Sequence, residues 1–127
     1  MEISAGKTRR AVPARDAIRT AAIQLFSEKG FAATSTREIC QRARVTKPVL
    51  YYHFSSKEQL YRELLIDACN ESRKMLFMAA QTGSTAREKM IEVLTTDFLH
   101  TVRNPELTLL FLRMVFSSEK ESPTVDY

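Results

Sequence analysis

The residues best suited to bind an anion lie close together between Ser35 and Phe54. Two adjacent tyrosines and a histidine occupy positions 51–53, and a threonine and a lysine precede them at Thr46 and Lys47. Each of these side chains can donate a hydrogen bond to a phosphate oxygen. Two tyrosines and a histidine side by side on a short exposed element are costly to explain without a binding role. The stretch is therefore a candidate site for a polyanion.

A capping box marks the start of the first element in this stretch. The Ser35 hydroxyl can accept a hydrogen bond from the backbone N–H of Glu38, and the Glu38 carboxylate can accept one from the backbone N–H of Ser35. We therefore expect a helix over about residues 36–42. A helix of two turns is too short to be stable alone, so it must pack on its neighbours.

A second short helix should follow after a tight turn. Residues 43–45 form the turn, Thr46 is the expected N-cap, and Pro48 suits the first turn of a helix over 47–53. Two helices joined in this way form a helix-turn-helix unit, whose second helix fits a DNA major groove about 12 Å wide. The side chains expected to hold the unit on a core are Ile39, Val45, Leu50 and Phe54.

Apolar residues spaced three and four apart predict that the rest of the chain is helical. The expected helices cover about residues 15–29, 57–81, 85–102 and 105–117, and Gly30 is the expected C-cap of the first. The last of them is apolar nearly all round, so it should be buried between partners or inside a larger domain. The predicted fold class is all-α.

The charges of the chain are unevenly distributed. The net charge is +4, residues 1–62 carry the basic excess, and residues 63–127 carry a small acidic excess. This asymmetry suggests a polyanion-binding module joined to a second module, and a chance excess on solvated helix faces is the alternative. Residues 1–12 lack periodicity and are expected to form a basic flexible arm, which either follows a DNA duplex or stays idle in solvent.

The sequence lacks the signatures of several protein classes. It has no Gly-rich phosphate loop, HExxH motif or paired catalytic signature, so we expect no enzyme activity, cofactor or metal. No apolar run approaches the roughly 20 residues needed to cross a membrane, and no secretory signal is visible, so the expected location is the cytoplasm. Cys40 and Cys69 have neither CxxC nor Cys/His spacing and are expected to be free thiols.

Together these motifs resemble the TetR family of one-component bacterial transcriptional regulators. The resemblance covers about residues 15–64, and LYYHF-x-SKE-x-L at 50–60 is its most specific part. The matching residues are Ile18, Ala21, Ala22, Leu25, Phe26, Gly30, Phe31, Thr36, Ile39, Val45, Thr46, Lys47, Leu50, Tyr51, Tyr52, His53, Phe54, Ser56, Lys57, Glu58 and Leu60. The chain departs from the family at Arg44, where a turn glycine is usual, and at Cys40, where alanine is usual.

The resemblance implies two domains. A helix-turn-helix DNA-binding domain would cover residues 13–56, and a helical domain for effector binding and dimerisation would begin at residue 57 with a long connecting helix. Regulators of this family are usually considerably longer, so residues 57–127 would be an incomplete second domain. The apolar surface of residues 107–116 would then be exposed and prone to association.

The resemblance also implies roles for individual residues. The second helix contacts the DNA backbone with its first residues, and the third reads base edges through residues 46–49. Tyr51 is expected on a phosphate or a thymine methyl, and Lys57 on a phosphate beside the fourth helix. For Lys47 a guanine contact and a phosphate contact are equally open. The expected DNA-binding residues are Ser35, Thr36, Arg37, Thr46, Lys47, Pro48, Val49, Tyr51, Tyr52, His53 and Lys57.

The mechanism implied by the family is repression by a homodimer on a palindromic double-stranded operator. Its two third helices would enter successive major grooves about 34–36 Å apart, and a small-molecule effector would release it, with the fourth helix as lever. The candidate pocket residues, for each of which a plain core role is the alternative, are Phe77, Met78, Phe98, His100, Phe111 and Met114. A rival interpretation is an all-helical interaction module whose basic face binds an acidic partner, or DNA non-specifically.

Overall fold

The computed structural model describes residues 12–116 and residue 123, and within them the chain forms helices and no strands. The helices are α1 (Ala14–Lys29), α2 (Thr36–Ala43), α3 (Lys47–His53), α4 (Lys57–Thr82), α5 (Ala86–Arg103) and α6 (Pro105–Phe116). Each lies within a residue or so of the helix expected from the sequence, which is ordinary for helix ends. The all-α prediction is confirmed. Except for Val12 and Pro123, the expected arm at 1–12 and the tail at 118–127 lie outside the described residues.

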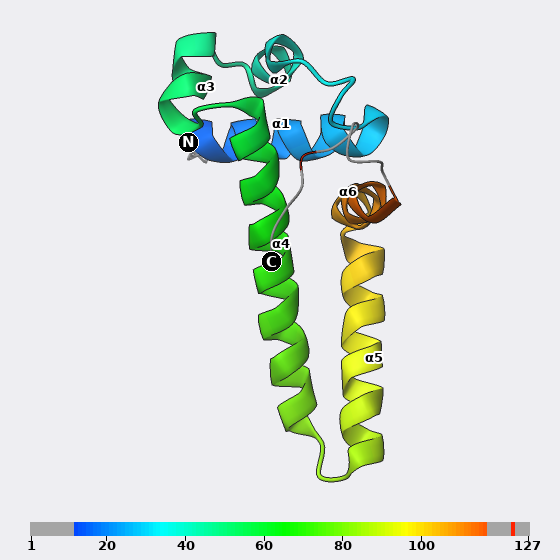
Figure 1. Ribbon diagram of the computed structural model, residues 1–127. Coiled ribbons are helices and arrows are strands. Elements are labelled where there is room, and N and C mark those ends of the chain that lie inside the picture. Colours follow the sequence, from blue (N-terminus) through cyan, green and yellow to red (C-terminus); the bar gives the residue numbers. More distant parts are fainter. Residues whose placement is uncertain (1–11, 117–122, 124–127) are drawn as a thin grey trace, which may run out of the picture.

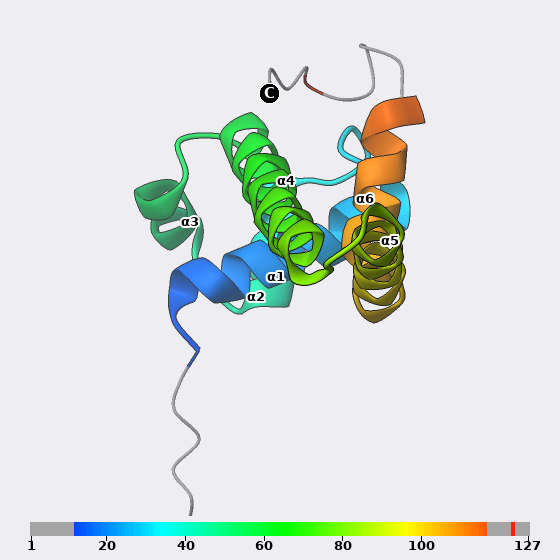
Figure 2. The ribbon, with the colours of Figure 1, turned by 90° about the horizontal axis from the view of Figure 1, so that it is seen from below.

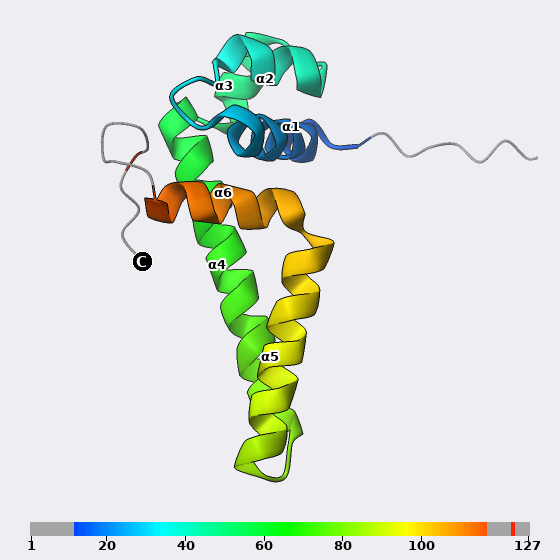
Figure 3. The same cartoon turned by 90° about the vertical axis from the view of Figure 1, so that its right-hand side faces the viewer.

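The helices form a head and a long hairpin (Figure 1). Helices α1, α2 and α3 make up the head together with the first turns of α4, and the rest of α4 runs away from it beside the antiparallel α5. Helix α6 lies at the junction and crosses beneath α1, as Figures 1 and 3 show. Seen from below, α3 projects on one side of α4, and α5 and α6 lie on the other (Figure 2).

The head is built on one hydrophobic core. Its buried residues are Ile18, Ala21, Ala22, Leu25, Phe26, Ile39, Cys40, Leu50, Phe54, Leu60, Tyr61, Leu64, Leu65 and Leu110. The expected anchors Ile39, Leu50 and Phe54 are at most 1% exposed, and Val45 packs against the same core. The predicted support of the helix-turn-helix is therefore confirmed.

An aromatic group fixes the direction in which α4 leaves the head. The ring of Phe26 meets Tyr61 edge to face with 5.2 Å between centroids, and Phe31 lies 5.8 Å from Phe26 and 5.0 Å from Tyr61. Such pairs add to the stability gained from burial alone. Because Tyr61 belongs to α4 and Phe26 to α1, these rings join the connecting helix to the head.

The turn between α2 and α3 places Arg44 in the left-handed region, with φ 56° and ψ 43°. Its backbone N–H donates to the carbonyls of Cys40 and Gln41 at the end of α2, and the Val45 backbone N–H also donates to the carbonyl of Cys40. The left-handed conformation costs a residue with a side chain about 1–2 kcal/mol. This strain is tolerable in a turn where the family usually has glycine. The departure noted at Arg44 therefore leaves the helix-turn-helix geometry intact.

Most apolar side chains of the hairpin and of α6 are exposed in the single chain. Helix α5 buries none of its residues, and its stripe of Met90, Ile91, Leu94, Phe98 and Val102 is 50–65% exposed. Helix α6 was expected to be buried nearly all round, but in the single chain Leu110 is its one buried residue. Within residues 12–116, each helix is too short or too polar to span a bilayer.

Candidate nucleic-acid interface

Helix α3 stands on the head through Leu50 and Phe54, and its outer face is open. Tyr51 is 50% exposed and Tyr52 is 84% exposed. The His53 ring lies edge to face against Tyr52, with 5.0 Å between centroids. A helix of seven residues has little stability of its own, so these anchors keep α3 in place while its donors remain accessible.

The first turn of α3 is accessible as well. Thr46 occupies the N-cap position with an extended backbone, but its side chain makes no capping hydrogen bond. Its hydroxyl is therefore available to a ligand. Lys47 and Pro48 are exposed, and Val49 is partly buried. The residues expected to meet base edges thus form an unobstructed tip at the start of the helix.

A polar hollow of about 420 Å³ lies where α2 and α4 begin. The predicted residues that line it are Ser35, Thr36, Tyr51 and Lys57, and the sequence analysis missed Ser55, Ser56 and Glu58 beside them. Two helix N-termini carry partial positive charge and unpaired N–H groups, which suit an anion. The hollow therefore brings together four of the residues expected on the DNA backbone, while Arg37, Tyr52, His53 and the residues expected on base edges do not line it.

Lys57 has structural partners that the sequence did not reveal. Its ammonium donates to the carbonyl of Phe31 at 3.0 Å and to the carbonyl of Thr34 at 2.9 Å. It also lies 4.1 Å from the centroid of the Phe31 ring, a cation–π contact. Lys57 therefore ties the start of α4 to the link between α1 and α2, and these two hydrogen bonds use two of the three N–H donors of its ammonium.

We expect Lys57→Ala to lower the free energy of unfolding by about 1.5–3 kcal/mol, the usual value for hydrogen bonds to a charged group. In this variant the carbonyl of Thr34 loses the hydrogen bond from Lys57, and the carbonyl of Phe31 keeps only the one from the Thr34 backbone N–H. Urea denaturation measures the change. Lys47→Ala serves as the matched control, because Lys47 is exposed, and its effect should stay within about 0.5 kcal/mol. Equal stabilities for the two variants would contradict this role of Lys57.

The start of α2 is held by the predicted capping box. The Ser35 hydroxyl accepts from the Glu38 backbone N–H at 3.3 Å, and the Glu38 carboxylate accepts from the Ser35 backbone N–H at 2.9 Å. The Lys29 ammonium of α1 pairs with the same carboxylate. The hydrogen bond from Lys29, followed by those from Ser35, lowers the pKa of Glu38 to about 2.

This pKa predicts that the capping box fails in acid. Because the folded pKa of Glu38 lies below its ordinary value of 4.5, its contribution to stability is complete above about pH 4.5 and is lost as the pH falls toward 2. We expect Glu38→Gln to remove that part of the pH dependence. The free energy of unfolding, measured between pH 2 and 7 for both chains, gives the comparison. Parallel curves would contradict the prediction.

The ion pairs of the head leave a restricted set of cations unpaired. Arg15 pairs with Glu63 at 2.8 Å, and Arg42 pairs with Glu28 at 2.7 Å. The basic residues between 12 and 56 for which the structure shows no ion pair are Arg37, Arg44 and Lys47. All three are exposed and lie in α2, in the turn or in α3. Within residues 12–56, the cations without an ion pair thus lie on the helix-turn-helix.

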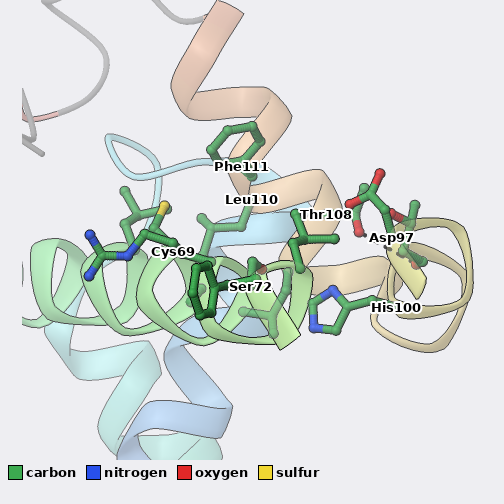
Figure 4. Close-up of a pocket in the computed structure, with 14 residues that line it drawn as sticks. Cys69, Ser72, Asp97, His100, Thr108, Leu110 and Phe111 are labelled. Carbon is green, nitrogen blue, oxygen red and sulfur yellow. Dashed lines mark hydrogen bonds between the residues drawn. The ribbon is translucent and has the colours of Figure 1, made fainter. Parts of the chain in front are cut away.

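A separate cleft of about 700 Å³ lies between α4, α5 and α6. Figure 4 shows Cys69 of α4 near one end, His100 and Asp97 of α5 near the other, and Leu110 of α6 between them. Of the six expected pocket residues, the cleft is lined by Phe77, His100 and Phe111. It is not lined by Met78, Phe98 or Met114.

The three misses lie elsewhere on the molecule. Met78 and Phe98 are 69% and 65% exposed and are absent from the cleft lining, and Met114 packs against the head core. The lining residues that the sequence analysis missed are Leu65, Ala68, Cys69, Ser72, Arg73, Leu76, Asp97, Thr101, Leu107, Thr108 and Leu110. Many are small or polar, and only the crossing of α6 over the hairpin brings them together. Cys40 and Cys69 are free thiols, as predicted, and burial raises the pKa of both.

Comparison with known proteins gives matches to bacterial regulators. A sequence profile of bacterial regulatory proteins of the tetR family matches residues 18–64. The chain is 31% identical over 110 residues to the HTH-type transcriptional regulator AcrR of Shigella flexneri, covering 83% of this chain and 51% of AcrR. It is 39% identical over 56 residues to the biofilm operon icaADBC HTH-type negative transcriptional regulator IcaR of Staphylococcus epidermidis, covering 44% of this chain and 30% of IcaR.

The fold is similar to that of a solved receptor as well. The crystal structure of a gamma-butyrolactone receptor matches 82% of this chain and 52% of its own, with a TM-score of 0.72 and 28% sequence identity. A match of that extent includes part of the hairpin in addition to the head. The chain spans about half, or less, of the length of the relatives that it matches.

Proposed function

We propose that this chain, which belongs to the TetR family of bacterial regulatory proteins, regulates transcription by binding a specific DNA sequence through α3. The observation that carries the proposal is the open face of α3. Its first turn offers Thr46 and Lys47, and its outer face offers Tyr51 and Tyr52, while Leu50 holds the helix on the core. A helix presented in this way fits a major groove.

The hollow between the starts of α2 and α4 supports a phosphate contact on the flank of that groove. Ser35, Tyr51 and Lys57 line it, and helix N-termini favour anions. Phosphate contacts position a protein on the duplex, and base contacts supply sequence information. Residues 46–49 would therefore specify sequence, whereas the hollow would fix the register of α3. Arg37 near the start of α2 and Arg44 in the turn after it, for which the structure shows no ion pair, add positive charge to the helix-turn-helix.

We further propose that the protein acts as a homodimeric repressor on a palindromic operator. Two copies of α3 about 34–36 Å apart would meet successive major grooves. The cleft between α4, α5 and α6 would take a small-molecule effector, since it is large enough at about 700 Å³ and mixes apolar with polar side chains. The matched IcaR is described as a negative regulator, which supports repression. Another match is described as a gamma-butyrolactone receptor, which supports a small-molecule effector.

Selection of binding sites from a random duplex pool, followed by titration at several salt concentrations, tests the proposal. We expect one palindromic sequence to bind far more tightly than a scrambled duplex. Log K should fall with log salt concentration at a slope of about −0.9 for each phosphate contact. Equal affinity for all duplexes would contradict specific regulation and favour a module whose basic face binds acidic partners or DNA without sequence preference.

A further inference from the structure

Helix α6 holds the C-terminal end of α1 through Arg113. The guanidinium Nε donates to the carbonyl of Ser27 at 2.9 Å, and Nη2 donates to the carbonyl of Glu28 at 3.1 Å. The last carbonyls of a helix have no partner within the helix and carry partial negative charge. A guanidinium from a segment 85 residues further along the chain therefore caps α1.

The same turn of α1 holds both ends of α2. The Glu28 carboxylate accepts from Arg42 Nη1 at 2.7 Å near the end of α2, and the Lys29 ammonium pairs with Glu38 in its first turn. The hydrogen bond from Arg42 also keeps the pKa of Glu28 below its ordinary value. Any displacement of the last turn of α1 therefore acts on α2 at two points.

The cleft borders directly on the helix that carries Arg113. Leu110 lines the cleft and at the same time is 1% exposed in the core of the head. Phe111 lines the cleft as well. Because Leu110 and Arg113 are three residues apart, they lie on the same side of α6. A molecule in the cleft that shifts α6 as a rigid helix at Leu110 would carry Arg113 with it.

We propose that Arg113 is a positioning residue that transmits a change in the position of α6 to α2 through the last turn of α1. The proposal rests on the proposed function, in which α2 and α3 form the DNA-binding unit. When α6 shifts, the two hydrogen bonds from Arg113 lengthen, and Glu28 and Lys29 lose their fixed positions. Helix α2 is then released at both ends. This path reaches the DNA-binding surface through α1 and is separate from any movement of α4.

Hydrogen–deuterium exchange of Arg113→Gln tests the first half of the path. We expect the amides of residues 36–43 to exchange several-fold faster, while those of residues 60–65 in the core of α4 keep their rates. Arg87→Gln is the matched control, because it removes the same charge from the exposed side of α5. Unchanged exchange in α2, or an equal increase in every helix, would overturn the proposal.

Two further variants separate the path from a general loss of stability. Arg113→Lys keeps the charge but loses the planar guanidinium that donates to two carbonyls at once. The exchange rate of α2 should therefore lie between those of the wild-type and Arg113→Gln chains. In a chain with Glu28→Gln and Lys29→Gln the links to α2 are already absent, so adding Arg113→Gln should leave the rate of α2 unchanged. A full additional effect would show that Arg113 acts on α2 by another route.

Labelling of Cys69 with N-ethylmaleimide tests the second half of the path, because it attaches a bulky succinimide group to a residue that lines the cleft. The labelled chain carries Cys40→Ala, so that Cys69 is the single thiol. We expect labelling to accelerate exchange in α2, and to have no such effect when Arg113→Gln is present. Unaltered exchange after labelling would overturn the link to the cleft. These measurements contain no DNA, so failure to bind a duplex refutes the proposed function and leaves the exchange results standing.

Discussion

Leu50→Ala is expected to lower the free energy of unfolding by about 2–5 kcal/mol and to abolish specific DNA binding. Leu50 is fully buried and is the one buried residue within α3. Truncation removes its contacts and leaves a cavity beneath the helix. Since a small domain has only about 5–15 kcal/mol of stability, the loss is a large share of the total. Urea denaturation and titration with the selected duplex measure the two effects.

Tyr52→Ala is the control for this experiment, because Tyr52 is on the same helix and 84% exposed. Its removal should change the free energy of unfolding by no more than about 0.5 kcal/mol. DNA affinity should nevertheless fall, since a donor to the duplex is lost. If Leu50→Ala were as stable as Tyr52→Ala, the account of α3 as a helix held by its anchors would be wrong.

Lys47→Ala is expected to weaken binding to the selected duplex by about 1–3 kcal/mol and to relax its sequence preference. Lys47 stands exposed in the first turn of α3, and no ion pair is shown for it in the described part of the chain. It is the one long donor among residues 46–49, and a guanine offers N7 and O6 as acceptors. Competition binding against a set of single-base variants of the duplex measures the change.

Arg37→Ala provides the comparison, because Arg37 lies at the start of α2 and is expected on the DNA backbone. It should weaken all duplexes equally and reduce the steepness of the salt dependence by about one phosphate contact. If Lys47→Ala shows the same uniform loss, Lys47 contacts a phosphate and base specificity must come from Thr46, Pro48 and Val49.

Lys57 illustrates how a residue can be placed on the correct element while its contacts remain hidden. The resemblance placed Lys57 at the start of the fourth helix and implied a phosphate contact there, and α4 does begin at Lys57. The sequence gives no indication that the carbonyls of Phe31 and Thr34 converge on its ammonium. Loss of DNA affinity in a Lys57 variant must therefore be compared with its loss of stability before a phosphate contact is inferred.

The residues that line the cleft could likewise be predicted only in part from the sequence. Large apolar side chains were the natural candidates from sequence, and Phe77 and Phe111 do line the cleft. The small and polar residues that line it, such as Ser72 and Thr108, are not marked by any sequence pattern as cleft residues. These residues share a surface only because α6 crosses the junction between the head and the hairpin (Figure 3).

The sequence by itself determined the helices, the helix-turn-helix and its anchors. These features depend on local signals, which are the capping box at Ser35, the proline in the first turn of α3, and apolar spacings of three and four. Such signals involve residues within one or two turns of each other, so they can be read without the fold.

Tertiary structure decided which cations stay free, what Lys57 holds, and how the cleft connects to the head. Each of these depends on the approach of residues far apart in the chain, as when Arg113 caps α1 at Ser27. Side-chain hydrogen bonds and ion pairs form over a few ångströms and carry no periodicity. Their partners are therefore set by how helices pack, and only the packed molecule reveals them.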